Sequence, residues 1–266
     1  MTFTILISCM HQDNHDILQR SNIQSDCVVV NQCDIDKIED FDFVNKFGEP
    51  KHCRFIYTTE RGLSRSRNMA IANAPAGAVC LLCDDDEILE DNVAETITNA
   101  FEQHPKSAAI LFYLIRKDLE KQKDYPLKEQ HLGFRQILHS NSIQMAFQKD
   151  FIIKHNIEFD EKMGSGTGNG GGEENKFLID LRRAKGNLWY SPKCIATVLP
   201  GQSQWHHGYD EHFLQNQGWA SRRIMGAFLS MGHLFIWGIK NHFRYCANMS
   251  MFRAYLNLYR GFFQKR

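Results

Sequence analysis

The chain has 266 residues, and its 31 lysines and arginines balance 31 aspartates and glutamates, so the formal net charge is zero. The composition is typical of a soluble globular protein, and because no dedicated nucleic-acid motif is present, we expect no nucleic-acid partner. Charge is unevenly spread, since no acid follows Glu211 whereas eight basic residues do. We therefore predict a neutral body over residues 1–212 and a basic helical segment over residues 213–266.

Two features indicate a cytoplasmic protein. The apolar start, residues 3–8, lacks a positively charged leader and a long apolar core, so we interpret it as a strand and not as a signal peptide. The cysteines are scattered, and the C-x-x-C pair of Cys80 and Cys83 has no second pair at zinc spacing. We expect reduced thiols that act as small hydrophobic side chains.

The first half of the chain alternates strand-like and helix-like segments. Strands are predicted at residues 3–8, 27–31, 54–57 and 79–83, helices at residues 64–74 and 91–101, and further strands at residues 108–115 and 142–147. This order predicts an α/β fold with a mostly parallel central sheet and right-handed crossovers.

An acidic run, Asp84, Asp85 and Asp86, ends the strand at residues 79–83. Open α/β sheets bind ligands at the carboxyl ends of their strands. If the alternation of an extended chain continues, Asp84 and Asp86 share one face and could hold a hard divalent cation, with Asp85 turned away. The alternative is a solvated acidic turn before the next helix.

Asp34 follows the strand at residues 27–31 and would lie at the same edge of the sheet. It could accept a hydrogen bond from a ribose hydroxyl or a base. Alternatively, it is a turn acid that caps residues 35–40.

Three arginines surround the predicted start of the helix at residues 64–74: Arg61, Arg65 and Arg67. Ser64 is the candidate cap of this helix. A helix amino end normally favours acids, so arginines and free amides together suit a diphosphate. Solvated arginines are the alternative.

A loop with six glycines in nine residues, 164–172, precedes Glu173 and Glu174. We expect a mobile loop followed by a helix, with one of the two acids delivered to a reaction centre as a general base. The alternative is a linker before ordinary helix-start acids. Further on, either His206 or His207 could be a third metal ligand or simply a packed or exposed histidine.

The basic carboxyl segment contains an uncharged stretch, residues 224–239. It is shorter than the roughly 20 residues that span a bilayer. Apolar faces with basic flanks, here and in residues 249–263, suggest helices that lie in a membrane interface. A helical subdomain packed on the core is the alternative.

These motifs, in this order and spacing, resemble the family 2 glycosyltransferases, which have the GT-A fold and are mostly inverting enzymes that use nucleotide-diphosphate sugars. The resemblance covers roughly residues 4–181, the greater part of a catalytic domain over residues 1–212. The chain looks most like bacterial enzymes that build capsular or other surface polysaccharides on a lipid carrier.

The resemblance implies a role for each motif. Glu174 would be the base, with Glu173 as the second choice, because this chain has Glu-Glu where relatives commonly have Glu-Asp. Mn²⁺ or Mg²⁺ would be bound by Asp86 and Asp84, with His206 or His207. The donor, most simply a UDP-sugar, would be bound by Ser8, Asp34, Arg61, Ser64, Arg67, Asp84 and Asp85.

The implied acceptor is a lipid-linked saccharide, and the implied location is the cytoplasmic face of the inner membrane. Two other functions compete with this one. A sugar-phosphate nucleotidyltransferase would also pair an α/β nucleotide fold with metal acids, but its glycine-rich, basic first loop is missing after Ser8. A membrane-surface adaptor would use only the carboxyl-terminal helices.

Overall fold

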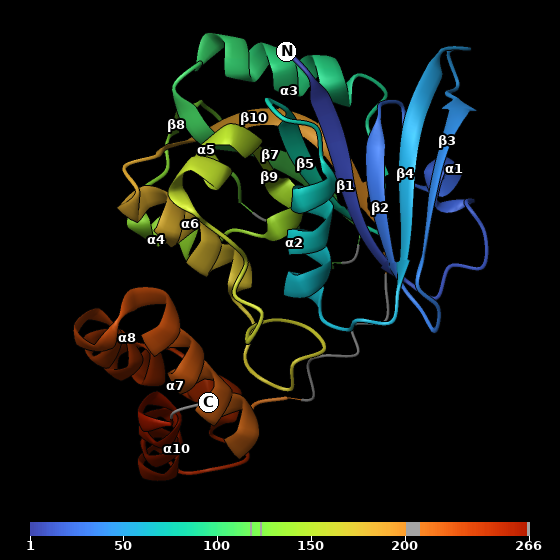
Figure 1. Cartoon of the computed structure of the whole chain (residues 1–266). Helices are drawn as coiled ribbons and strands as arrows, with labels where there is room; N and C mark the ends of the chain where they lie inside the picture. The colour runs from blue at the N-terminus through green and yellow to red at the C-terminus, as the bar shows by residue number, and fades with distance from the viewer. Residues whose placement is uncertain (118, 123, 201–207, 265–266) are drawn as a thin grey trace.

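A computed structural model describes residues 1–117, 119–122, 124–200 and 208–264, which form one large sheet with helices on both faces and a group of helices below it (Figure 1). The strands are β1 (Phe3–Met10), β2 (Cys27–Gln32), β3 (Lys37–Val44), β4 (Pro50–Thr58), β5 (Val79–Asp84), β6 (Glu87–Leu89), β7 (Ser107–Arg116), β8 (Gln130–His131), β9 (Met145–Gln148) and β10 (Asn187–Val198). The helices are α1 (Ile17–Arg20), α2 (Leu63–Asn73), α3 (Val93–Gln103), α4 (Phe134–Ile137), the 3₁₀ helix η1 (Ser142–Gln144), α5 (Lys149–His155), α6 (Glu173–Arg183), α7 (Glu211–Met225), α8 (Ala227–Lys240), α9 (His242–Tyr245) and α10 (Met251–Phe263).

The sheet confirms the predicted α/β class. Its strand order is β3-β4-β2-β1-β5-β9-β7-β10-β6, with β8 paired to β10. The four strands predicted first, β1, β2, β4 and β5, are parallel neighbours. Their carboxyl ends therefore form one rim, at which Ser8 lies opposite Asp84 in register.

Four strands depart from the parallel arrangement, namely β3, β9 and the short strands β6 and β8, which both pair antiparallel with β10. β3 runs antiparallel to β4 at the edge of the sheet, so residues 35–40, considered above as a capped segment, lead into a strand instead. β9 is inserted antiparallel between β5 and β7. The strand predicted at residues 142–147 begins as the 3₁₀ turn Ser142–Gln144, and only its second half pairs in the sheet.

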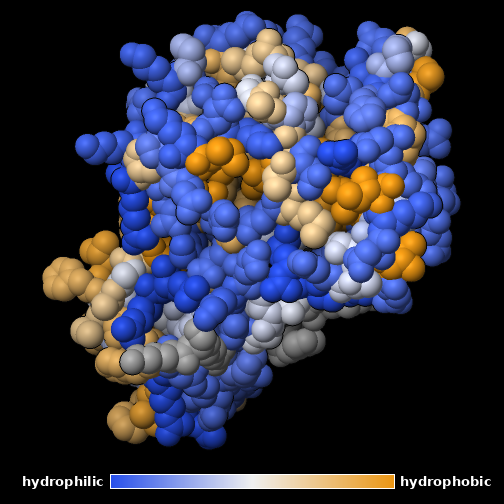
Figure 2. Space-filling model, in the orientation of Figure 1, coloured by the Kyte–Doolittle hydropathy of each residue, from blue (hydrophilic) through white to orange (hydrophobic). Residues whose placement is uncertain are grey.

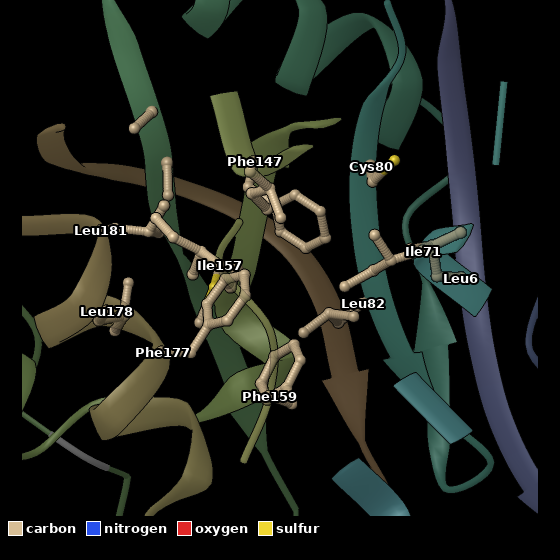
Figure 3. Packing of buried hydrophobic residues seen from close by; sticks show 14 of the residues in the cluster. Leu6, Ile71, Cys80, Leu82, Phe147, Ile157, Phe159, Phe177, Leu178 and Leu181 are labelled. Carbon is tan, nitrogen blue, oxygen red and sulfur yellow. The ribbon is translucent and has the colours of Figure 1, made fainter. Parts of the chain in front are cut away.

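The core has two halves because successive strand residues point to opposite faces of the sheet. Leu6, Cys80 and Leu82 face α2 and α6, where they join Ile71 and Phe177 (Figure 3). The residues between them in sequence, such as Ile7, Leu81 and Cys83, face α3. All eight cysteines are free thiols, and Cys80 and Cys83 lie in different halves of the core, as expected for small hydrophobic side chains.

The carboxyl-terminal helices form a packed unit of their own. Leu214 of α7, Leu234 of α8 and Leu258 of α10 share a buried cluster, while Trp219 of α7 joins the main core. The uncharged stretch is not one helix, because the chain turns at Gly226 between α7 and α8. Among the described residues, no helix has the length and apolarity needed to cross a membrane. The predicted boundary between residues 212 and 213 falls inside α7.

Close packing of α7 on α10 generates a stability prediction. An added Cβ at Gly218 would lie 1.9 Å from the carbonyl oxygen of Leu258, so Gly218→Ala must push the two helices apart. We expect a loss of about 1–3 kcal/mol in the free energy of unfolding, as for other overpacked cores. Urea unfolding followed by circular dichroism measures it.

Gly232→Ala in α8 is the matched control, because nothing lies within 4 Å of its added Cβ. It should leave stability unchanged or raise it by up to about 1 kcal/mol through helix propensity. Equal unfolding curves for the two variants would show that α7 and α10 do not approach as described.

Candidate active site

The predicted donor residues gather at the rim formed by β1, β2 and β5. Ser8 is buried at the end of β1, and its Oγ accepts a hydrogen bond from the Oγ of Ser66 at 2.9 Å. Ser8 therefore ties the start of α2 to the sheet, directly beside Asp84.

Asp34 and Arg61 form an exposed ion pair at this rim. Nη2 of Arg61 donates to Oδ1 of Asp34 at 2.8 Å, and the Asp34 side chain is 89% exposed. Nη1 of Arg61 donates to the carbonyl of Thr58 at the end of β4. The loop is fixed further by Gly62, whose N–H donates to the side chain of Gln32. An accessible cation and carboxylate thus stand side by side where a nucleotide ligand is expected.

Ser64 does not cap α2, contrary to the prediction. The helix begins at Leu63, and its cap position is Gly62, which has a φ of 122° that favours glycine. Ser64 is instead one residue inside the helix and fully buried, where its Oγ donates to the carbonyl of Met163 at 2.9 Å. It joins α2 to the segment that precedes the glycine loop.

Arg67 is the centre of the site. Its side chain is only 2% exposed, and Nη2 lies 3.1 Å from Oδ1 of Asp84 while Nη1 lies 3.1 Å from Oε1 of Glu173. Nη2 also donates to Oγ of Ser142 at 2.8 Å, and the guanidinium stacks over Phe159. Burial alone would lower the pKa of Arg67, but the neighbouring negative charges outweigh it and raise that pKa. One cation therefore links β5, α6 and η1.

The strand before the acidic run ends one residue later than predicted. Asp84 is the last residue of β5, and Asp85 and Asp86 form the exposed turn to β6. The alternation that placed Asp84 and Asp86 on one face is therefore wrong, because the chain stops being extended at Asp84. The next acid, Glu87, is buried and accepts a hydrogen bond from the Asp84 N–H at 2.8 Å. Its burial and the charge of Asp84 raise the pKa of Glu87, so its carboxyl serves the turn and not a ligand.

Glu173 and Glu174 open α6, as predicted, immediately after Gly172, which has a φ of 95°. Glu173 is buried against Arg67, whereas Glu174 is half-buried. Burial, and next the negative charge of Glu173, raise the pKa of Glu174 to about 8. A carboxylate with a pKa near physiological pH is suited to accept a proton, and this environment favours Glu174 over Glu173 as a base.

The glycine loop contacts both α2 and α7. The N–H of Leu63 donates to the carbonyl of Ser165, and the N–H of Gly164 donates to the carbonyl of Gly170. An added Cβ at Gly170 would lie 2.8 Å from the carbonyl oxygen of Asn216 in α7. The glycines thus let the loop fit between the start of α2 and α7.

A cleft of about 500 Å³ lies between this loop and α7, and Glu174 contributes to its lining. The opposite wall presents His212, Asn216 and Gln217 of α7. Sequence reasoning missed these three because the segment was assessed for apolar and basic residues only. It also missed Ser142, for which the sequence holds no signal, since its role follows from the fold alone.

The metal ligands predicted from the sequence are Asp84, Asp86 and one of His206 and His207. Asp84 and Asp86 provide the hard oxygen atoms that Mg²⁺ and Mn²⁺ prefer. His206 and His207 lie outside the described residues. Within the described part of the chain, no group of three or more His, Cys, Asp or Glu residues is arranged to hold a metal ion.

Comparison with known proteins shows the family and the fold of the chain. Residues 15–166 match the family model described as Glycosyl transferase family 2. The crystal structure of S. aureus TarS 1–349 is similar, with a TM-score of 0.62 and 15% identity over 98% of this chain and 80% of that chain. For its complex with UDP-GlcNAc the TM-score is 0.65 and the identity 13%, over 97% of this chain and 79% of that chain. For its complex with UDP the TM-score is 0.61 and the identity 12%, over 98% of this chain and 81% of that chain. No curated protein sequence matched. Because the family model spans more than half of the chain, this protein belongs to glycosyl transferase family 2.

Proposed function

We propose that this glycosyltransferase takes its sugar from a nucleoside-diphosphate donor and transfers it, with inversion, to a hydroxyl of a lipid-linked saccharide, as in surface polysaccharide synthesis. The observation that carries the proposal is the bridge made by Arg67 between Asp84, at the donor rim, and Glu173, beside the base candidate Glu174. Because S. aureus TarS has been solved with UDP-GlcNAc and with UDP, UDP is the first nucleotide to test.

A divalent cation fits the donor rim. Mg²⁺ in phosphate-binding sites is usually held by one or two carboxylates together with substrate oxygens and water. Asp86, exposed in the turn, and Asp84 would supply such carboxylates. When bound, the metal would offset the negative charge that develops on the departing diphosphate. Arg61 lies at the same rim and adds a fixed positive charge for that purpose.

The acceptor side follows from the position of Glu174. Its carboxylate lines the cleft beside α7, where an acceptor hydroxyl would lose its proton to the base as it attacks the sugar. A single displacement of this kind inverts the anomeric carbon. The polar side chains on α7 are suited to hold a saccharide, because they offer an imidazole and amides to its hydroxyls.

Membership of a glycosyltransferase family argues against both alternatives drawn from the sequence. A nucleotidyltransferase would lack its glycine-rich, basic loop after β1, where the chain has His11, Gln12 and Asp13. A non-enzymatic adaptor would leave the buried charge of Arg67 and the raised pKa of Glu174 without a purpose.

Asp86→Asn tests the metal site. Isothermal titration with UDP, with and without Mn²⁺, should show binding that Mn²⁺ strengthens in the parent protein but not in this variant, because an amide is a much weaker ligand than a carboxylate. Asp42→Asn is the matched control, since Asp42 lies on β3 near the opposite rim of the sheet. If the affinity for UDP were the same with and without Mn²⁺, and the same in Asp86→Asn as in the parent, the proposed metal site would be wrong.

Glu174→Gln tests the base. The amide keeps the size of the side chain but cannot accept the proton, so transfer should fall about 100-fold or more while UDP binding persists. Glu161→Gln, which alters an exposed acid paired with Arg65, should leave both unchanged. If Glu174→Gln transferred sugar at the parental rate, Glu174 would not be the base and Glu173 would be the next candidate.

The pKa of Glu174 predicts a pH profile. Below about pH 8 the carboxyl is protonated and cannot act as a base, so kcat/KM should rise with pH and reach half of its plateau near pH 8. In Glu173→Gln one negative neighbour is lost, which lowers the pKa of Glu174 and moves the midpoint to lower pH. An unmoved midpoint would mean that a group other than Glu174 controls the profile.

A further inference from the structure

The carboxyl-terminal helices expose a large apolar surface. On α8, Phe228 is 91% exposed, and on α10, Phe252 is 80% exposed. We define the apolar face as the exposed hydrophobic residues of α8, α9 and α10: Phe228, Leu229, Met231, Phe235, Ile236, Ile239, Phe243, Met251, Phe252, Leu256 and Phe263. Figure 2 shows these apolar atoms gathered along the outer edge of the helical unit, at the lower left. Exposed patches of this kind mark interaction sites in soluble proteins.

The apolar face is continuous because two tyrosines fix α10 beside α8. The hydroxyl of Tyr255 donates to the carbonyl of Phe235 at 2.7 Å, and that of Tyr259 donates to the carbonyl of Met231 at 3.1 Å. On α8 the buried residues Ser230, Leu234 and Gly238 recur every four positions, so only one side of this apolar helix is covered. Most of its remaining surface is exposed, apart from the half-buried His233 and Trp237.

The surroundings of this face are basic. Lys240 ends α8, Arg244 lies in α9 over the ring of Phe243, and Arg260 is exposed on α10 between Leu256 and Phe263. The last acid of the sequence, Glu211, is paired with Arg253. Because no Asp or Glu follows Glu211 in the sequence, the apolar side chains of this unit lie among residues that are basic on balance.

We propose that the apolar face binds the interface of an anionic bilayer, with its phenylalanines among the upper acyl chains and the basic residues at the headgroups. Helices with this division of surface lie in the membrane plane and need not span it. A second copy of the chain is the poorer occupant. A two-fold interface would bring Lys240 and Arg260 of one copy toward the same charges of the other.

The position of α7 gives this surface a consequence for the site. α7 packs on α8 and α10 through Leu214, and its polar side lines the cleft beside Glu174. A protein docked through the apolar face would therefore hold the cleft close to the bilayer. Resting on the proposed function, this orientation suits an acceptor whose saccharide is attached to a membrane lipid.

Vesicle flotation with the full chain tests the surface. Vesicles of phosphatidylcholine with phosphatidylglycerol should carry the protein upward, and vesicles of phosphatidylcholine alone should carry much less. In Phe228→Glu/Phe252→Glu, two large apolar anchors become charged, so the bound fraction at limiting lipid should fall about tenfold or more. Leu127→Glu is the matched control, because Leu127 is 92% exposed far along the chain from this unit and should leave binding unchanged.

Two further measurements separate the possible outcomes. UDP titration and thermal unfolding of the double variant should match the parent, which would show that the fold and the donor site are intact. Persistent binding of the double variant to anionic vesicles would overturn the proposal. A second outcome would also overturn it. The parent would form a dimer in sedimentation velocity without lipid, would not bind vesicles, and would become a monomer in the double variant. If the parent protein bound none of UDP, GDP and dTDP, the proposed function would be refuted while the membrane result would stand.

Discussion

The site depends on one buried positive charge. Taking a guanidinium out of water costs several kcal/mol, and breaking a buried ion pair by removing one partner typically costs about 3–5 kcal/mol. Arg67 is therefore stable only while Asp84 and Glu173 both face it. Asp84 of β5 and Glu173 of α6 are 89 residues apart in the sequence, so the charge of Arg67 fixes the end of β5 and the start of α6 at one spacing. Any movement of either element is opposed by the need to keep Arg67 paired.

Small residues allow the other parts to approach this centre. Gly62 starts α2 in a conformation that side chains rarely adopt, and Gly170 and Gly172 pack the glycine loop against α7. Where segments pack this closely, short serine side chains make the polar contacts, because longer side chains would not fit. Ser64 and Ser66 each make one short hydrogen bond to a neighbouring segment. The loop and helix that carry the ligand-facing groups are thus positioned by backbone fit as much as by charge.

Much of this arrangement could be predicted from the sequence, because strongly apolar strands and the acids after them depend on local pattern. β5 and the rim position of Asp84 are examples. The errors have a common origin in tertiary contacts. The turn at Asp85 depends on the burial of Glu87, which accepts a hydrogen bond from the N–H of Asp84. The start of α2 at Gly62 depends on the hydrogen bond from Ser64 to Met163. The antiparallel direction of β9 depends on its neighbours in the sheet. Arg67 was predicted as a donor ligand, and its partnership with Glu173 joins residues 106 positions apart, which no local pattern encodes.

α7 belongs to two hydrophobic clusters at once, since Leu214 lies in the helical unit and Trp219 and Ile224 lie in the main core. The helical unit is consequently not a detachable module. A chain shortened before α7 would leave part of the core beneath α6 open to water and would lose one wall of the cleft. The outer surfaces of α8 and α10 can therefore change without disturbing the core or the cleft, whereas α7 cannot.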